Sequence, residues 1–336
     1  MSVHPFEQLD PVRVLAAVES IGFLADGRLF ALNSYENRVY RVGLEEGEGG
    51  ELAKPGVVPG QCVVKFYRPG RWSDEQILEE HGFGLELADA GIPVAAPLLR
   101  DGQSLFFHDG FRFAVFECRR GGPPELDAPG ALSLLGRTLG RLHAIGSRAR
   151  FRYRESLSDA DCGARALDAV LAAGVLPSSI EHRYARLAAE VVAAIREAFE
   201  AAGPLRLRRL HGDCHPGNLL WSDQGPVFVD LDDCIEGPAV QDLWMLLPGG
   251  SDAPAWSALR EGYEQFTWFN DVEMSLVEPL RTLRMLNHSA WLVQRWDDPA
   301  FPRAFPWFGA ARYWEDQIDD LSGQLEALQG PARPAW

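Results

Sequence analysis

Residues 210–235, LHGDCHPGNLLWSDQGPVFVDLDDCI, are the most informative stretch of this 336-residue sequence. They read as a loop, a strand, a turn and a second strand, in a part of the chain that otherwise carries helical patterns. Asp213 and Asn218 lie in the loop, and Asp230 ends the second strand. Because carboxylate and amide oxygens are the ligands that magnesium prefers, the stretch predicts a magnesium-dependent site.

The spacing of these residues is that of a protein-kinase catalytic loop. The segment from His211 to Asn218 fits H-x-D-x-x-x-x-N, and Asp230 follows twelve residues later, at the position of the Asp of D-F-G. In this pattern Asp213 takes the proton of the acceptor hydroxyl, whereas Asn218 and Asp230 hold the magnesium that neutralises the phosphates. A chance match is one alternative. A zinc site around His211 is another, which the lack of a second Cys/His pair nearby disfavours.

A lysine upstream completes the predicted phosphate site. The segment from Val63 to Phe66 resembles the strand V-A-I-K, whose lysine reaches the α- and β-phosphates when a carboxylate orients it. Lys65 is that lysine, and Glu80 on the following predicted helix is its expected partner, with the adjacent Glu79 as competitor. The alternative is an exposed strand lysine with two solvated glutamates.

The loop expected to cover the phosphates departs from the protein-kinase pattern. There is no G-x-G-x-x-G, and the corresponding turn has the sequence NSYENR at residues 33–38. Backbone N–H groups and the Ser34 hydroxyl are expected to contact phosphate, and Arg38 to add positive charge. An ordinary polar hairpin turn is the alternative. Asp232 and Asp233, which follow Asp230, are interpreted as either a second magnesium site or solvated carboxylates.

The first 118 residues predict an antiparallel sheet with inserted helices. Strands are expected within 28–42 around a turn at 33–37, over 62–69, and in a hairpin over 106–118 that turns at 108–110. Helices are expected over 10–21, where Asp10 can cap the first turn, and over 74–90. The acidic, Gly- and Pro-rich residues 43–60 predict a solvated loop.

A Gly- and Pro-rich run at 118–130 separates this sheet from a mostly helical second half, with helices expected over 131–146, 181–201 and within 255–330. The predicted fold is α+β, bilobal and protein-kinase-like. Residues 1–118 would form a small N-lobe that covers the nucleotide, with its base against a hinge at 116–119. Residues 119–336 would form a C-lobe with the catalytic loop, the magnesium site and acceptor-binding helices.

The composition indicates an ordinary globular protein and disfavours some classes of partner. Hydrophobic residues make up 46% and charged residues 24%, as in ordinary globular proteins. The net charge of −16 disfavours nucleic acid and anionic membranes as partners, because both attract positive surfaces. Five cysteines without a C-x-x-C pair indicate free thiols in a reducing compartment. No signal pattern and no apolar run of about 18 residues is present, which predicts a cytoplasmic protein.

Taken together, these motifs resemble the aminoglycoside phosphotransferase and choline kinase superfamily, whose members have a protein-kinase-like fold without a glycine-rich loop. Longer phrases are similar to bacterial stress-response Ser/Thr kinases of this superfamily, among them LNSYENRVYRV (32–42), VVKFYRPGRW (63–72) and FVDLDDCIEGPAVQDLWMLLPG (228–249). The resemblance implies ATP as donor, Asp213 as base, magnesium on Asn218 and Asp230, and contact of Ser34 with ATP. It also implies a role in surviving envelope or oxidative stress by counteracting cell death.

The expected activity is therefore transfer of the γ-phosphoryl group of MgATP to a Ser or Thr hydroxyl of a protein partner, by a chain that acts as a monomer. A small-molecule kinase for an amino alcohol, a sugar or an aminoglycoside is the first alternative, because the γ-phosphate site does not encode the acceptor. An acidic protein would suit such a cationic acceptor. A nucleotide-binding scaffold without catalysis is the second alternative, which the complete set of motif residues disfavours.

Overall fold

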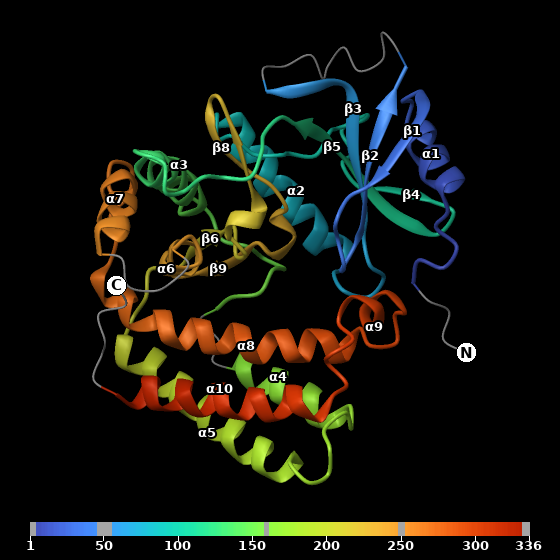
Figure 1. The fold of residues 1–336 in the computed structure, drawn as a ribbon. Coiled ribbons are helices and arrows are strands. Elements are labelled where there is room, and N and C mark those ends of the chain that lie inside the picture. Colours follow the sequence, from blue (N-terminus) through green and yellow to red (C-terminus); the bar gives the residue numbers. More distant parts are fainter. Residues whose placement is uncertain (1–4, 46–55, 158–160, 248–252, 331–336) are drawn as a thin grey trace. The chain divides into compact units, whose positions relative to one another are not determined.

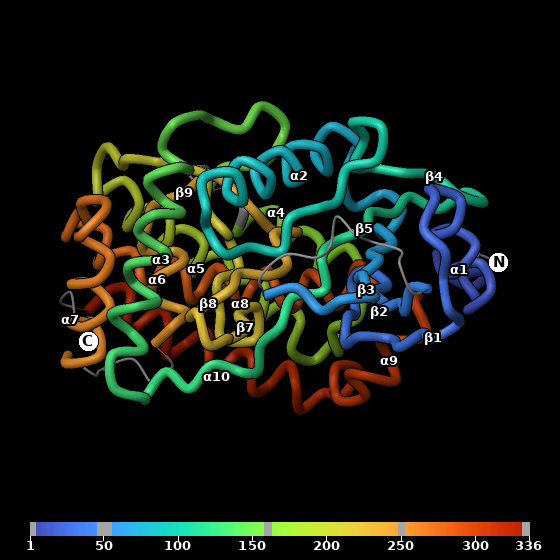
Figure 2. Tube along the Cα trace, turned by 90° about the horizontal axis from the view of Figure 1, so that it is seen from above, coloured from blue at the N-terminus to red at the C-terminus, as the bar shows by residue number. Residues whose placement is uncertain are grey.

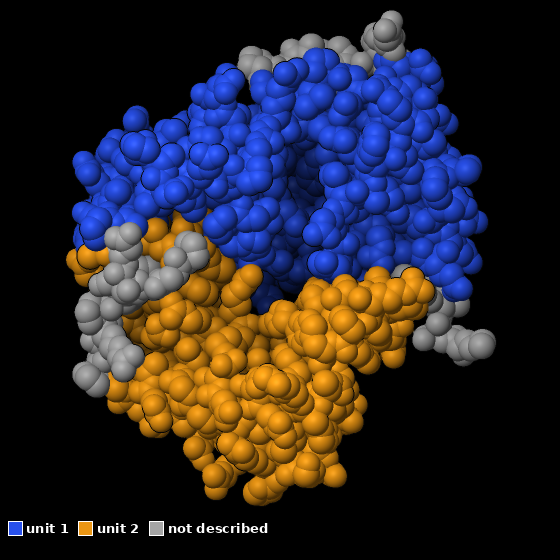
Figure 3. Space-filling model, viewed as in Figure 1, with its two compact units in different colours: residues 1–155, 209–235, 254–268 blue, residues 156–208, 236–253, 269–336 orange. Residues whose placement is uncertain are grey.

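The computed structural model describes residues 5–45, 56–157, 161–247 and 253–330 (Figure 1). The chain forms two compact units, each assembled from three separate segments (Figure 3). Unit 1 contains residues 1–155, 209–235 and 254–268, and unit 2 contains residues 156–208, 236–253 and 269–336. No boundary of these units falls at residue 118, and the division into two lobes there stays a prediction.

Unit 1 is built on a five-stranded antiparallel sheet with the strand order β1-β2-β3-β5-β4. Its strands are β1 (Ala25–Ala31), β2 (Arg38–Leu44), β3 (Val57–Phe66), β4 (Phe106–His108) and β5 (Phe111–Arg119). The strands expected around the turn at 33–37 and the hairpin at 106–118 are confirmed. In the register of the central strands, Lys65 lies opposite Val39 on β2 and Ala114 on β5.

The loop predicted over 43–60 is shorter than expected on both sides. Strand β2 continues to Leu44, and β3 begins at Val57 and not near residue 62. Val57 is buried and pairs with Arg119 on β5, and a shift of register before Cys62 accommodates the Pro-Gly pair at 59–60. Long-range pairing therefore overrides a composition typical of loops. Residues 46–55 of the predicted loop lie outside the described part of the chain.

Helix α1 (Pro11–Ser20) packs beside the sheet. It begins as predicted, because the Asp10 carboxylate accepts the N–H of Arg13 at 2.8 Å and Pro11 stands at the first helical position. Val14, Ala17 and Val18 are buried in the same core as the strands, and the helix contacts β1 and β4 (Figure 2).

Helix α2 (Asp74–Asp89) brings a glutamate into the interior of unit 1. A capping box formed by Ser73 and Gln76 sets its first turn. Ile77, Glu80 and Leu87 are buried on one face, at the spacing that places side chains on one side of a helix. The helix expected over 74–90 is confirmed, and its register decides which acidic side chain faces inward.

The rest of unit 1 includes residues 210–235, which contain the predicted catalytic loop. Its elements include α3 (Ala131–Gly146), the 3₁₀ turns η2 (Pro216–Asn218) and η3 (Leu231–Asp233), the hairpin of β7 (Leu219–Ser222) and β8 (Gly225–Phe228), and most of α7 (Ala253–Tyr263). Helix α3 has the predicted bounds. Two of the places where the chain passes from one unit to the other lie within β6 (Arg208–Leu210) and β9 (Ile235–Gly237).

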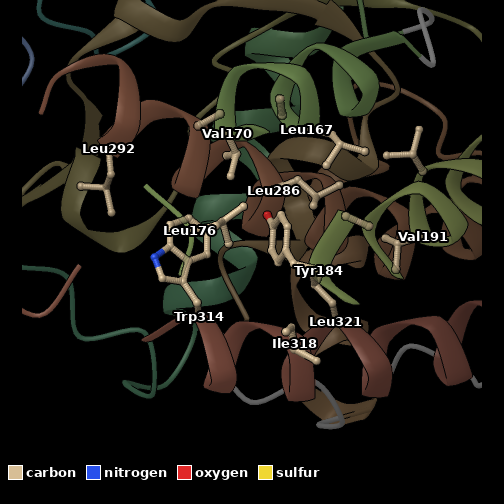
Figure 4. Packing of buried hydrophobic residues seen from close by; sticks show 14 of the residues in the cluster. Leu167, Val170, Leu176, Tyr184, Val191, Leu286, Leu292, Trp314, Ile318 and Leu321 are labelled. Carbon is tan, nitrogen blue, oxygen red and sulfur yellow. The ribbon is translucent and has the colours of Figure 1, made fainter. Parts of the chain in front are cut away.

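Unit 2 is mostly helical in its described part. It contains α4 (Asp161–Ala172), α5 (Glu181–Ala202), α6 (Val240–Trp244), η4 (Asp271–Leu276), α8 (Val277–Gln294), α9 (Ala300–Ala304) and α10 (Ala311–Gln329). Its core joins α4, α5, α8 and α10, and Tyr184 meets Trp314 edge to face with ring centroids 5.4 Å apart (Figure 4). The helices expected over 181–201 and within 255–330 are confirmed. Among the described residues, no helix is both long and apolar enough to cross a membrane.

Candidate active site

One cavity of about 410 Å³ in unit 1 gathers most of the predicted site residues. Figure 3 shows the hollow in the surface of this unit. The predicted residues that line the cavity are Ser34, Lys65, Glu80, Asn218 and Asp230. Apolar side chains line it as well, namely Val39, Val63 and Phe116 from three strands and Leu32 just after β1. Polar and charged groups set among apolar side chains in a cavity of this size are typical of a small-molecule site.

Lys65 lies at the centre of the charged groups in this cavity. Its Nζ is 3.3 Å from Glu80, 3.2 Å from Asp230 and 2.8 Å from Asp232, and only 7% of its side chain is exposed. Burial alone would lower the pKa of Lys65, but its three carboxylate partners hold that pKa well above its usual range. The ammonium group is therefore charged and is held near the cavity.

The structure separates the two candidate partners of Lys65. Glu80 contacts Lys65 through Oε1 and the guanidinium of Arg154, at 3.0 Å, through Oε2. Burial raises the pKa of Glu80, and these two cations oppose that shift. Glu79 instead accepts the backbone N–H groups of residues 152–154, at 2.6, 2.7 and 2.9 Å. Arg154 is fully buried and was not found from the sequence, because no local pattern marks it.

The loop from His211 to Asn218 is held by its own hydrogen bonds. The buried ring of His211 contacts the carbonyl oxygen of Val229 at 2.9 Å through Nε2, and the N–H of Val229 donates to the carbonyl of Asn218 at 3.1 Å. The side-chain amide of Asn218 donates to the carbonyl of Asp213 at 2.9 Å and to its Oδ2 at 3.2 Å. Asp213 is thus tied directly to Asn218, which lines the cavity.

Asp230 adopts a backbone conformation that is uncommon for a residue with a side chain. Its φ of 59° and ψ of 67° lie in the left-handed region, which Asp tolerates better than most residues. The side chain is 55% exposed and lines the cavity. Strained backbone that is kept at a cavity is typical of functional positions.

Residues Asn218 and Asp230 suit a magnesium ion that is shared with phosphate. In the part of the chain that the structure describes, no group of three or more His, Cys, Asp or Glu side chains could hold a metal ion. Magnesium bound to a nucleotide needs only one or two protein oxygens, because phosphates and water supply the others. The amide oxygen of Asn218 and the exposed carboxylate of Asp230 line one cavity and meet that requirement.

Asp232 is neither solvated nor placed for a second magnesium. Its carboxylate is buried and contacts Lys65, the guanidinium of Arg71 and, at 3.2 Å, the side-chain amide of Asn37. Burial would raise the pKa of Asp232, but Arg71 and Lys65 hold it well below its usual range. Asp232 therefore serves as a buried ion-pair partner, which corrects its interpretation as a solvated carboxylate, whereas Asp233 is an exposed carboxylate that pairs with Arg71.

Side-chain hydrogen bonds hold the turn that replaces a glycine-rich loop. Ser34 lines the cavity, and its Oγ donates to the carbonyl of Asn37 at 3.2 Å. The side chain of Asn37 accepts the N–H of Arg68 at 3.0 Å and donates to Asp232. Arg38 donates to two carbonyls of its own turn and covers the ring of Phe6. Arg38 is not among the lining residues, so the positive charge expected from it is not supplied at the cavity wall.

The end of β5, where the sequence places the hinge, also lines the cavity. Residues 116–119 line it, and the rings of Phe116 and His81 form a T-shaped pair with centroids 6.0 Å apart. Burial lowers the pKa of His81 to about 3, so the ring is neutral at physiological pH. Its nitrogens contact the hydroxyls of Tyr67 at 2.7 Å and Ser104 at 2.8 Å. No sequence pattern indicated this buried group.

Comparison with known proteins decides the family. The model of the phosphotransferase enzyme family matches residues 29–273, a range that includes all the predicted site residues. The chain belongs to this family. It is therefore a phosphotransferase, as the motifs predicted.

Two relatives match almost the whole chain. Stress response kinase A of Escherichia coli (strain K12) is 40% identical over 336 residues, covering 98% of this chain and 97% of that protein. Serine/threonine protein kinase RdoA of Salmonella typhimurium (strain LT2) is 39% identical over 328 residues, covering 97% and 95%. The resemblance to bacterial stress-response kinases is confirmed.

Solved structures confirm the fold class. Amicoumacin kinase hAmiN, solved in complex with AMP-PNP, Ca²⁺ and Ami, matches with a TM-score of 0.69 at 21% identity, over 98% of this chain and 95% of that chain. A microcompartment-associated aminopropanol kinase matches with a TM-score of 0.65 at 18% identity, over 94% and 96%. The α+β, kinase-like fold predicted from the sequence is therefore confirmed.

Proposed function

We propose that this phosphotransferase is an ATP- and magnesium-dependent Ser/Thr protein kinase that acts in a bacterial stress response. The observation that carries the proposal is the gathering of Lys65, Glu80, Asn218 and Asp230 around one cavity, with Asp213 tied to Asn218. The names of the relatives at 39–40% identity support a protein acceptor and a stress role. The proposal includes that the kinase counteracts stress-induced cell death, as the sequence resemblance implies. ATP as donor and the buried free thiols of unit 1 support a cytoplasmic location.

The charged residues of the cavity would bind and orient ATP. Lys65 would contact the α- and β-phosphates, because Glu80, which Arg154 holds in place, orients its ammonium group. Ser34 would contact the phosphates from the turn, and residues 116–119 would border the base. Asn218 and Asp230 would hold magnesium, which neutralises the charge that builds up on the phosphates. The lobes would then divide at 118, with acceptor-binding helices in the later part.

Asp213 would act on the acceptor. Its carboxylate would accept the proton of the Ser or Thr hydroxyl as the new oxygen–phosphorus bond forms and the bond to ADP breaks. The hydrogen bonds from Asn218 set the position of this carboxylate before the acceptor arrives. Positioning and charge stabilisation would supply most of the rate enhancement.

A small-molecule kinase is the second candidate. The net charge of −16 favours a cationic acceptor such as an amino alcohol or an aminoglycoside. The solved structures with this fold include an aminopropanol kinase and an amicoumacin kinase, which supports the same candidate. The site residues serve either acceptor, so only an acceptor experiment separates the two candidates.

The test is a transfer assay with ATP radiolabelled in its γ-phosphate, in the presence of magnesium. Wild type, Asp213→Asn and Asp230→Ala are each assayed under three conditions. These are no added acceptor, a generic basic protein, and a panel of small hydroxyl compounds. We expect label on Ser or Thr of protein, and a kcat that falls by about 10² to 10⁴ in Asp213→Asn while MgATP affinity stays unchanged. Asp230→Ala should lose magnesium-dependent nucleotide binding.

Each outcome points to one candidate. Label that appears only on a small compound supports the second candidate. If no label is transferred although ATP is bound, the chain is a nucleotide-binding scaffold. Wild-type kcat in Asp213→Asn would show that another group accepts the proton.

A further inference from the structure

His215 contacts the carboxylate of Asp213. Its Nε2 lies 3.3 Å from Oδ2 of Asp213, and 35% of its side chain is exposed. The side-chain nitrogen of Asn218 lies 3.2 Å from the same oxygen. Two nitrogens from one short segment therefore converge on one oxygen of the carboxylate.

The backbone fixes which nitrogen of His215 carries the proton. The N–H of Gly217 donates to Nδ1 of the ring at 3.0 Å, so Nδ1 carries the lone pair. In the neutral imidazole the proton then lies on Nε2, the nitrogen that faces Asp213. The ring presents a donor to the carboxylate without any need to become charged.

The absence of a side chain at position 217 makes this ring position possible. A Cβ at Gly217 would lie 2.7 Å from Cε1 and 2.9 Å from Nδ1 of His215, which is closer than real Cβ atoms approach. Any side chain there would push the ring away from its place against the backbone. Position 217 therefore offers an independent way to displace the ring.

We propose that His215 is a positioning residue for Asp213. By donating from Nε2 to Oδ2 it would hold the carboxylate, together with Asn218, in the orientation that meets the acceptor hydroxyl. The proton of the acceptor goes to Asp213, and His215 keeps its own. The contact of 3.3 Å is long, and we expect it to shorten when substrates bind, as catalytic hydrogen bonds do. The proposal rests on the function proposed above.

The first experiment separates positioning from nucleotide binding. We expect His215→Ala to lower kcat about tenfold, the effect of losing one hydrogen bond to a charged group, while the KM for ATP and the Kd for MgATP stay within about twofold. His215→Gln keeps an N–H donor on a side chain of similar reach and should restore most of kcat. His182→Ala, at an exposed histidine of α5, is the matched control and should have wild-type kinetics.

A double-mutant cycle tests the geometry. Gly217→Ala should lower kcat about as much as His215→Ala, because its Cβ displaces the ring. In the His215→Ala background the same substitution should have no further effect. Additive losses would mean that Gly217 acts on something other than the ring, and would overturn the proposal. Far-UV circular dichroism of each variant checks that it is folded.

The failure of this proposal is distinguishable from failure of the proposed function. If wild type transfers label and Asp213→Asn does not, but His215→Ala keeps the wild-type kcat, then Asp213 is the base and His215 does not position it. If wild type transfers no label to any acceptor, both proposals are overturned together. A loss of MgATP binding in His215→Ala would place His215 in nucleotide binding and would also overturn its role as a positioning residue.

Discussion

Two neighbouring glutamates on α2 have different surroundings, and these surroundings decide what each can do. Glu80 lies on the buried face of the helix between two cations, whereas Glu79 is half-buried and accepts three backbone N–H groups. Helical spacing from the buried Ile77 favours Glu80, so this part of the site could be predicted. Arg154 could not be predicted, because it lies in a loop 74 positions away in the sequence.

Substitution of each glutamate should separate catalysis from stability. In Glu80→Gln a neutral amide faces Lys65 and Arg154, so we expect kcat/KM for ATP to fall about tenfold or more. In Glu79→Gln kcat/KM should change less than about threefold. Its free energy of unfolding should fall by about 1.5 kcal/mol, because three charge-assisted hydrogen bonds weaken.

Initial rates at varied ATP concentration and urea unfolding measure the two effects. Each variant is the matched control of the other, because the same change is made one position apart. A large kinetic loss in Glu79→Gln with little in Glu80→Gln would contradict the pairing of Lys65 with Glu80.

Asp232 shows which properties of a site residue a sequence motif predicts and which it does not. The sequence DLDD indicated three acids near one site, but it did not tell which of them is buried. Burial of Asp232 depends on Lys65, Arg71 and Asn37, which three other segments bring together. The motif residues are local in sequence and could be found, whereas the partners that neutralise them come from the folded chain.

Among the elements, those with local signals were predicted, whereas the start of a strand that depends on distant pairing was not. Helices α2 and α3 follow from apolar spacing and capping residues, which lie within the segment itself. The start of β3 at Val57 depends on pairing with Arg119, some 60 residues later. Its Pro-Gly pair therefore predicted a loop, and only the sheet itself shows that a strand passes through it.

Close approach of a neighbouring backbone outweighs helix propensity at a glycine in a packed helix, whereas propensity decides where no atom is close. In α3, a Cβ at Gly140 would lie 2.5 Å from the carbonyl oxygen of Tyr263 at the end of α7, which packs beside α3 (Figure 1). In α2, a Cβ at the exposed Gly82 would meet no atom within 4 Å. The same substitution should therefore have opposite effects at the two positions.

We expect Gly82→Ala to raise the free energy of unfolding by about 0.5–1 kcal/mol, because alanine is the better helix former and restricts the unfolded chain. Gly140→Ala should lower it by about 2 kcal/mol, because α3 and α7 must move apart. Urea unfolding followed by circular dichroism measures both. A stabilised Gly140→Ala would show that the two helices do not pack as closely as described.

At the scale of the whole molecule, each compact unit combines segments that lie far apart in the sequence. Unit 1 contains the sheet of the first 155 residues together with 209–235 and 254–268, so the site residues belong to one unit although they lie up to 196 positions apart. A linear division at 118 follows from composition, which changes where Gly and Pro cluster. Packing decides which distant segments belong to the same unit, and no change of composition along the sequence marks those segments.

The net charge of −16 also belongs to the whole molecule, and it makes a prediction about the acceptor. If the natural acceptor is a basic protein, attraction over distances of about 10 Å raises the rate of encounter at low salt. Raising sodium chloride from about 0.05 to 0.5 M should then lower kcat/KM for a basic protein acceptor by about tenfold. Initial rates at saturating MgATP measure the effect, with kcat as the internal control, because screening acts on encounter and not on the bound complex. A neutral peptide with one serine should show little salt dependence, and equal slopes for the two acceptors would mean that the charge of the protein does not select its substrate.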